Sequence, residues 1–216
     1  METPTCLTYL KGGAMNISIP KSLKERINEK SGLRAAYEFA LEYHNKTGQL
    51  RSGTARPYIV HPIAVACILL EWGAPTHVVM AGLLHDTVED TDATEQQIHL
   101  VFGNDIAVIV EGLTDVASKF DGDREQRFKI NVRHSANADW RSKWVKMADI
   151  FHNTSDLHKQ KVFRKAYLKE KWVQLHVIWD ERLVDYFAEV KANILRVAEI
   201  MNVDLPELAT PTLLSD

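Results

Sequence analysis

Apolar residues recur at helical spacing along most of this chain. One such stripe predicts a helix over residues 31–46. Its members are Leu33, Ala36, Tyr37, Ala40 and Leu41. The polar segment that follows, residues 47–57, contains two glycines and ends at a proline, which indicates a loop. The hydrophobic pattern therefore begins as an amphipathic helix followed by an irregular connection.

The same spacing predicts a succession of helices after the loop. Their expected ranges are 60–72, 75–91, 94–103, 105–117, 125–138, 140–157 and two long helices within 162–201. Thr94 and Gln97 have the spacing of a capping box, which marks the start of the third of these helices. No strand pattern of any length occurs, so we expect an all-α fold, a helical bundle in a single domain. The folded part is expected over residues 21–202, with tails at 1–20 and 203–216.

Composition narrows the class of protein without identifying it. With 216 residues the chain is long enough for one sizeable core, and its formal net charge of -3 argues against a nucleic-acid-binding protein. No apolar run approaches the ~20 residues that span a bilayer, and residues 1–13 lack the apolar core of a signal peptide. Cys6 and Cys67 are far apart, and Cys67 lies in an apolar run where a buried free thiol is expected. We therefore expect a cytoplasmic protein with no membrane partner.

The densest cluster of reactive side chains lies between Leu83 and Asp90. This segment holds an adjacent His85-Asp86 pair and an adjacent Glu89-Asp90 pair inside an apolar run. In a continuous helix these four residues would share an arc of about 140°, since each residue turns the chain by about 100°. Three carboxylates on one face repel one another unless a cation neutralises them. The segment therefore predicts a divalent metal ion, which would also use the histidine.

Two further side chains complete a set of candidate metal ligands. His61 stands at the start of the predicted 60–72 helix, and Asp149 lies within an apolar helix. Each alone has an ordinary explanation, as a capping or core histidine or as a salt-bridged carboxylate. Together they are polar residues inside apolar helices, and their burial without partners would be costly. With His85 and Asp86 they form a mixed nitrogen and oxygen set, which suits Mn²⁺, Fe²⁺ or Zn²⁺ better than Ca²⁺.

The order of these candidate ligands matches a known signature. His61, the His85-Asp86 pair and Asp149 resemble the H…HD…D pattern of the HD phosphohydrolase superfamily. The fuller motif is more specific, and its parts are PYIVHP at 57–62, GLLHDTVEDT at 82–91, KMAD at 146–149 and Asn153. Over residues 33–185 the chain resembles the hydrolase domain of the RelA/SpoT alarmone enzymes. It is most similar to the stand-alone small alarmone hydrolases.

That resemblance implies a manganese-dependent guanosine-3′,5′-bis(diphosphate) 3′-diphosphatase. Such an enzyme removes the 3′-pyrophosphate from (p)ppGpp and leaves GDP or GTP. The metal ligands carried over from the family are His61, His85, Asp86 and Asp149. Glu89 and Asp90 correspond to the catalytic pair, which positions and deprotonates the attacking water. The chemistry is reasonable, because a metal lowers the pKa of bound water and a carboxylate one turn away can accept its proton.

The resemblance also implies contacts with the nucleotide. It places Asn153 near the sugar and the metal, and Tyr58 beneath the site or against the purine. Arg51 is expected to pack on the guanine by a cation–π contact. Arg56 is an alternative to it, because the loop at residues 51–57 is longer than in the family and differently spaced.

Phosphate contacts require further cations, and several follow the predicted Asp149 helix. Arg164 and Lys165 are the expected ligands of the diphosphate, since phosphate recognition prefers arginine geometry where two contacts are made. Residues 154–157 depart from the family, whose long members carry an arginine and a threonine there. This departure affects the residues that would contact the inner phosphate or the ribose of the nucleotide.

Two other functions remain open at this point. The altered basic loop favours an HD hydrolase that acts on another nucleotide. That nucleotide would be the adenosine alarmone (p)ppApp or the substrate of a nucleotidase. The other is a non-catalytic alarmone-binding regulator on the same fold. Glu89 and Asp90 argue against a regulator, because a binder needs no water-activating pair. The expected partner is a small-molecule nucleotide and no nucleic acid, and the sequence contains no signal for an oligomeric state.

Overall fold

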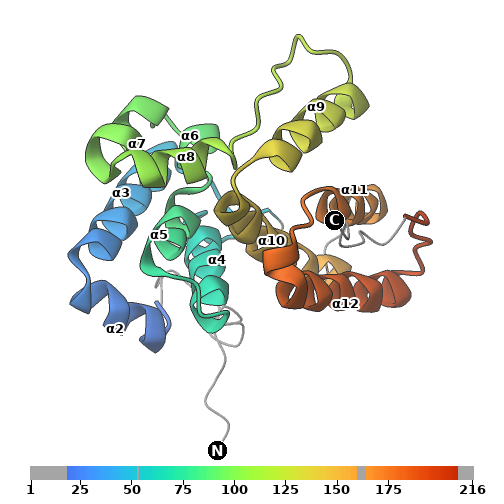
Figure 1. Ribbon diagram of the computed structural model, residues 1–216, viewed down its shortest axis with the longest axis horizontal. Helices are drawn as coiled ribbons and strands as arrows, with labels where there is room; N and C mark the ends of the chain where they lie inside the picture. The colour runs from blue at the N-terminus through green and yellow to red at the C-terminus, as the bar shows by residue number, and fades with distance from the viewer. Residues whose placement is uncertain (1–18, 53, 160–163, 209–216) are drawn as a thin grey trace, which may run out of the picture. The chain divides into compact units, whose positions relative to one another are not determined.

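The computed structural model describes residues 19–52, 54–159 and 164–208. The described helices fall into two compact units, divided between Thr114 and Asp115, and each unit is considered by itself (Figure 1). Within the described residues, the β structure is an isolated antiparallel bridge between Leu50 and Pro57. The all-α fold expected from the sequence is confirmed.

The first unit contains the helices α2 to α8, coloured from blue to green in Figure 1. Their bounds are α2 Lys21–Glu29, α3 Ser31–Thr47, α4 Val60–Glu71, α5 Thr76–Leu84, α6 Thr87–Asp90, α7 Glu95–Phe102 and α8 Asn104–Glu111. Helix α5 packs against α3, α4 and α8 and so lies at the centre of this unit. The capping box predicted at Thr94 and Gln97 is present at the start of α7.

Helices α4 and α5 approach each other closely. Every residue of α4 from Val60 to Leu69 is buried. A Cβ atom on Gly82 of α5 would lie 2.6 Å from Leu69 Cδ1 and 3.6 Å from Ala66 Cα. Real Cβ atoms essentially never come within 3.0 Å of a neighbour, so the distance to Leu69 is too short for a side chain, and glycine at this position permits the close packing of the two helices.

The predicted helix over residues 75–91 is interrupted. Helix α5 ends at Leu84, the next two residues form a turn, and α6 begins at Thr87. Two side chains lie against backbone carbonyls at this break. The Thr87 hydroxyl donates to Leu84 O over 2.6 Å, and His85 Nδ1 lies 2.9 Å from Gly82 O. Such side-chain bonds compete with helical backbone bonds, so the expectation of one continuous helical face is wrong.

The second unit contains α9 to α12. Its elements are α9 Arg124–Asn137, α10 Trp140–Ser155, the 3₁₀ helix η1 Leu157–Lys159, α11 Arg164–Val177, the 3₁₀ helix η2 Glu181–Leu183 and α12 Val184–Met201. Helix α10 packs against α11 and α12. All six of its residues from Val145 to Ile150 are buried, including Lys146 and Asp149, so burial extends further around the helix than the amphipathic pattern predicted.

Several boundaries differ from the sequence expectation. Helix α8 was expected to extend to about residue 117 but ends at Glu111. Gly112 follows it, and the Thr114 hydroxyl donates to Val110 O over 3.0 Å. Helix α2 was not predicted. Beyond α12, Pro206 O accepts a hydrogen bond of 2.9 Å from Trp172 Nε1, so this stretch contacts α11. The limits of the folded domain stay a prediction, since much of both expected tails lies outside the described residues.

Cys67 is buried in α4 with 1 % of its surface exposed, but its thiol is not free. The expectation of a free thiol is therefore wrong, and Cys6, the other cysteine of the sequence, lies outside the described residues. The cytoplasmic location, which rested partly on a free thiol, stays a prediction. In the described part of the chain, no helix combines the length and apolar character needed to cross a bilayer.

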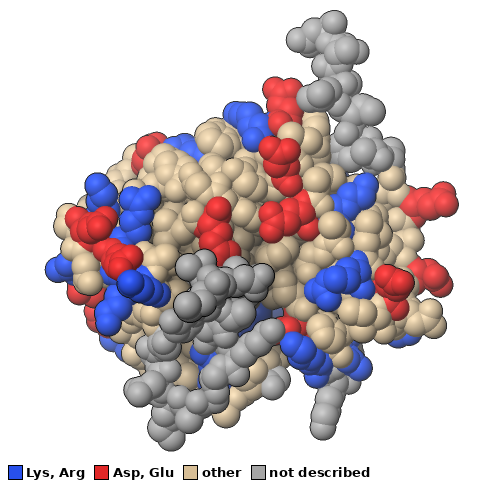
Figure 2. Space-filling view, turned by 90° about the horizontal axis from the view of Figure 1, so that it is seen from below, with Lys and Arg blue, Asp and Glu red and all other residues tan. Residues whose placement is uncertain are grey.

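Charged side chains of both signs are interspersed on the surface. Figure 2 shows one face, on which Lys and Arg lie among Asp and Glu. Exposed pairs one helical turn apart contribute to this pattern, for example Lys46 with Glu42 and Lys129 with Glu125. Such pairs add little to stability. The described residues on this face form no continuous basic surface, and the expectation of no nucleic-acid partner stays a prediction.

Candidate metal centre

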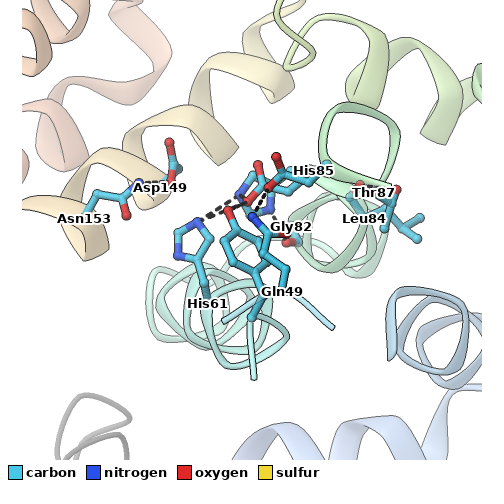
Figure 3. A network of polar contacts seen from close by, with 11 residues as sticks. Gln49, His61, Gly82, Leu84, His85, Thr87, Asp149 and Asn153 are labelled. Atoms are coloured by element: carbon cyan, nitrogen blue, oxygen red, sulfur yellow. Dashed lines mark hydrogen bonds and ion pairs between the residues drawn. The ribbon is translucent and has the colours of Figure 1, made fainter. Parts of the chain in front are cut away.

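His61 is a buried polar residue in the first turn of α4. It lies within the fully buried run of that helix and is 1 % exposed. The chain reaches this helix through the turn that begins at Pro57, where His61 N donates to Tyr58 O over 2.9 Å. The short turn fixes the imidazole at the start of α4, where it points out of the helix toward His85 (Figure 3).

His85 lies at the end of α5 and is 2 % exposed. Its Nδ1 atom lies 2.9 Å from Gly82 O. A carbonyl oxygen can only accept, so in the neutral ring Nδ1 carries the proton and Nε2 presents a lone pair. Metal-binding histidines are held in this way, with the second ring nitrogen donating to a backbone carbonyl.

Three ligand atoms converge at this point. His61 Nε2 and His85 Nε2 lie 3.2 Å apart, and Asp86 Oδ2 lies 3.4 Å from the first and 3.0 Å from the second. Two atoms bound to one ion at about 2.1 Å are about 3.0 Å apart at a right angle and about 3.4 Å apart at a tetrahedral angle. The three side chains are therefore a group that could hold a metal ion, and their role as ligands stays a prediction.

Tyr58 supports this group from the loop before α4. Its hydroxyl donates to Asp86 Oδ2 over 2.7 Å, and its ring meets that of His61 edge-on with centroids 5.7 Å apart. Ligands of a metal are commonly held by such a hydrogen bond from a neighbouring side chain. The hydroxyl of Tyr58 thus contacts a candidate metal ligand, and contact of its ring with a purine stays a prediction.

Asp90 stands beside the three candidate ligands and Glu89 is more exposed. Both residues lie in α6. Burial, and then the nearby Asp86 carboxylate, raise the pKa of Asp90 above its ordinary value of 3.8. Hydrogen bonds from Tyr58 and Gln49 oppose this shift, and Gln49 Nε2 lies 3.5 Å from Asp90 Oδ2. An aspartate with a raised pKa is a better proton acceptor near neutral pH than an ordinary one.

Two polar residues beside the centre were not identified from the sequence. Gln49 follows Gly48, which ends α3 in the left-handed conformation with φ of 64°. His44 lies on the buried face of α3 with its ring centroid 5.1 Å from that of Tyr58. The signal for His44 was present, because it continues the apolar stripe of Leu33, Ala36 and Ala40. Gln49 lies in a loop, where spacing gives no such signal.

Asp149 and Asn153 lie together in the second unit, on α10. Asp149 is 5 % exposed, and Asn153 Nδ2 donates to its Oδ1 atom (Figure 3). The amide therefore shares the face of the carboxylate one helical turn earlier, as the spacing predicted. The role of Asp149 as a fourth ligand, and that of Asn153 near the nucleotide, stay predictions.

The expected base-contacting arginines face each other in one loop of the first unit. Arg51 N donates to Arg56 O over 2.9 Å, beside the isolated bridge between Leu50 and Pro57. Both side chains therefore start from adjacent positions of the same turn. These backbone contacts do not select one of the two arginines as the contact with the base, so this alternative stays open.

Arg164 and Lys165, the expected diphosphate ligands, contact backbone carbonyls in the second unit. Arg164 Nη1 donates to His158 O over 2.5 Å, and Lys165 Nζ donates to Asn202 O over 3.0 Å. Asn202 is the C-cap of α12, where a cation is favourable because helix C-termini carry partial negative charge. These contacts give both cations a structural explanation, and their binding of phosphate stays a prediction.

Comparison with known proteins places these residues in context. The HD domain family matches residues 36–176, which spans parts of both units. The guanosine-3′,5′-bis(diphosphate) 3′-pyrophosphohydrolase MESH1 of Danio rerio is 40% identical over 148 residues, covering 67% of this chain and 74% of the relative. The bifunctional (p)ppGpp synthase/hydrolase SpoT of Escherichia coli strain K12 is 41% identical over 128 residues, but these make up only 18% of that protein.

A solved structure has the same fold. It is described as a metazoan ortholog of SpoT that hydrolyzes ppGpp. The match has a TM-score of 0.65 at 23% sequence identity and covers 81% of this chain and 98% of the other. At this level of identity the likeness concerns the fold alone.

Proposed function

Because this chain belongs to the HD domain family, we propose that it is a metal-dependent (p)ppGpp 3′-pyrophosphohydrolase. The observation that carries the proposal is the convergence of His61, His85 and Asp86 on one point, with ring nitrogens and a carboxylate oxygen 3.0–3.4 Å apart. The similarity to MESH1, which is named for this reaction, supports the choice of substrate.

The donor set would hold one divalent ion. His61, His85 and Asp86 supply three ligands, and we propose Asp149 as the fourth. Two imidazoles and two carboxylates fit Mn²⁺, the ion that the family resemblance implies, although Fe²⁺ and Zn²⁺ accept the same donors. When bound, such an ion lowers the pKa of water and polarises a phosphate oxygen.

Asp90 is proposed as the group that removes a proton from the attacking water. Its raised pKa suits this role, because the driving force for proton transfer grows as the pKa of the base approaches that of the donor. Glu89, which lies in the same helix and is more exposed, would orient the water. Attack at the phosphorus attached to the 3′-oxygen releases pyrophosphate and leaves GDP or GTP.

A second candidate is hydrolysis of an adenosine alarmone by the same site. The specific observation behind it is the loop in which Arg51 and Arg56 occupy facing positions. Cation–π packing of an arginine on a purine does not by itself distinguish guanine from adenine. Parallel assays with (p)ppGpp and (p)ppApp would separate the two, and Arg51→Ala and Arg56→Ala would show which arginine affects the KM for each.

The metal-dependent hydrolysis is tested by substitution of Asp86. Asp86→Asn keeps the size of the side chain and removes the charge, so hydrolysis of ppGpp in Mn²⁺ should fall at least about 1000-fold. Asp92→Asn is a matched control, since Asp92 is exposed and lies just after α6. Full activity of Asp86→Asn would show that hydrolysis does not depend on the proposed metal centre.

A further inference from the structure

One buried histidine of the first unit has no part in the proposed chemistry. His44 on α3 is 2 % exposed, and neither of its ring nitrogens has a hydrogen-bond partner among the described residues. Burial lowers the pKa of His44 from 6.5 to about 4, so its ring is neutral near pH 7. A buried donor or acceptor without a partner reduces stability. Stability alone would therefore favour an apolar side chain at this position.

The ring of His44 packs against Tyr58. The two ring centroids lie 5.1 Å apart with an angle of 40° between the planes. The Tyr58 ring also contacts the ring of His61, with the centroids 5.7 Å apart and an angle of 69° between the planes. Tyr58 is thus in contact with two imidazoles, one from α3 and one from α4. Its ring position depends on both helices.

The hydroxyl of Tyr58 links this packing to the carboxylates of the site. It donates to Asp86 Oδ2 over 2.7 Å, and its hydrogen bond also lowers the pKa of Asp90. One phenol therefore serves a candidate metal ligand and the candidate base. A small displacement of the Tyr58 ring would alter the orientation of Asp86 relative to the two histidines.

We propose that His44 is a positioning residue of the metal centre, which acts by supporting the ring of Tyr58 and, through Tyr58, the carboxylate of Asp86. This inference rests on the proposed metal site. Side chains that hold a metal ligand by a hydrogen bond commonly change metal affinity about 10- to 100-fold when they are removed. His44 acts one contact further away, so we expect the lower end of that range.

The test is a double-mutant cycle in metal affinity. The apo full-length chain is titrated with Mn²⁺ by calorimetry, and the dissociation constant is compared for wild type, His44→Ala, Tyr58→Phe and the double variant. We expect each single variant to raise the Kd about 10-fold. If His44 acts through Tyr58, the double variant is no weaker than the weaker single variant, because coupled residues are not additive.

Two further variants separate positioning from general loss of stability. Ile98→Ala removes a fully buried side chain of α7, so it should lower the melting temperature and leave the Kd for Mn²⁺ unchanged. His44→Phe keeps an aromatic ring beside Tyr58 and should stay within about threefold of the wild-type Kd.

Each outcome bears on one proposal or on both. A wild type that binds no Mn²⁺ overturns the metal site, and this inference with it. A wild type that binds Mn²⁺ while His44→Ala binds equally well overturns the inference alone. Additive effects of His44→Ala and Tyr58→Phe, or a His44→Phe variant as weak as His44→Ala, also contradict the route through Tyr58.

Discussion

The Nε2 atoms of His61 and His85 lie 3.2 Å apart although 24 positions separate the two residues in the sequence. The contact depends on how closely α4 and α5 approach, because the histidines lie at the start of one helix and the end of the other. Gly82 of α5 lies against α4 at a point where a Cβ atom would come too close to Leu69. The geometry of the centre is thus a consequence of helix packing.

Gly82→Ala should therefore disturb the metal centre from outside it. The new Cβ would lie 2.6 Å from Leu69 Cδ1, and Leu69 is fully buried, so the helices or that side chain must shift. Such overpacking costs about 1–3 kcal/mol of unfolding free energy. We expect a lower melting temperature and weaker Mn²⁺ binding, measured by thermal unfolding and calorimetry.

Gly32→Ala is the matched control for this change. Gly32 is also helical, but its Cβ would meet only the flexible end of Met80, at 3.3 Å and 3.4 Å. Metal affinity should stay unchanged in this variant. If Gly32→Ala and Gly82→Ala weakened Mn²⁺ binding equally, the close approach of α4 and α5 would not explain the effect.

Substitution of Asp149 tests whether the second unit supplies a ligand. Asp149→Asn keeps the shape of the side chain and weakens it as a metal donor, so the affinity for Mn²⁺ should fall at least about 10-fold. Asp156→Asn is the control, since Asp156 follows the same helix and pairs with Lys159 at the surface. An Asp149→Asn protein that binds Mn²⁺ like the wild type would leave three ligands from the first unit only.

The fall of kcat at acid pH, its acid limb, should reflect the protonation of Asp90. Burial and the Asp86 charge raise its pKa above 3.8, and only the ionised form accepts a proton, so kcat should fall as the pH decreases through that raised pKa. Asp90→Asn should reduce kcat at least about 100-fold. The measurement is the pH dependence of kcat at saturating Mn²⁺ and substrate.

Gln49 provides a variant that moves this limb in a known direction. The hydrogen bond from Gln49 lowers the pKa of Asp90. Gln49→Leu removes this bond, so the fall of kcat at acid pH should move to higher pH, while the enzyme stays active above that pH. A limb that moves to lower pH, or does not move, would show that Asp90 is not the titrating base.

His44 makes the stability of the metal-free protein depend on pH. Its pKa is about 4 in the folded protein and 6.5 without the effect of burial. Below pH 6.5 the unfolded chain therefore binds a proton that the folded chain does not, and the free energy of unfolding falls until about pH 4. The difference corresponds to about 3 kcal/mol.

Urea unfolding between pH 7.5 and pH 4.5 in the presence of a chelator measures this dependence. His44→Phe should flatten it, whereas His99→Leu, at an exposed position of α7, should leave it unchanged. An equally steep acid loss in His44→Phe would assign the effect to other groups.

The sequence predicted most of the described helices and the side chains that converge, but not α2 or the break between α5 and α6. Periodicity identified α3, whose apolar stripe faces a core, and the apolar run that ends before Gly73 identified α4, which is buried from Val60 to Leu69. The motif identified His61, His85 and Asp86, which the structure brings together. These features depend on spacing within one helix or on residues matched to a family.

What the sequence did not predict depends on local hydrogen bonds and on contacts between distant segments. Periodicity carried the helix through His85, but the Thr87 hydroxyl bonded to Leu84 O accompanies a break there. The contacts of Gln49 with Asp90 and of His44 with Tyr58 arise only when α3, its following loop and α6 meet. The spacing of residues along one segment does not show which distant segments come into contact.

The central claim is tested most directly by product analysis. Purified protein is incubated with guanosine 3′,5′-bis(diphosphate) and Mn²⁺, with and without a chelator, and the products are separated by ion-exchange chromatography and identified by ³¹P spectroscopy. The account predicts GDP and pyrophosphate in equal amounts, with no turnover after chelation or in Asp86→Asn. Release of inorganic phosphate in place of pyrophosphate, or turnover that survives chelation, would contradict it.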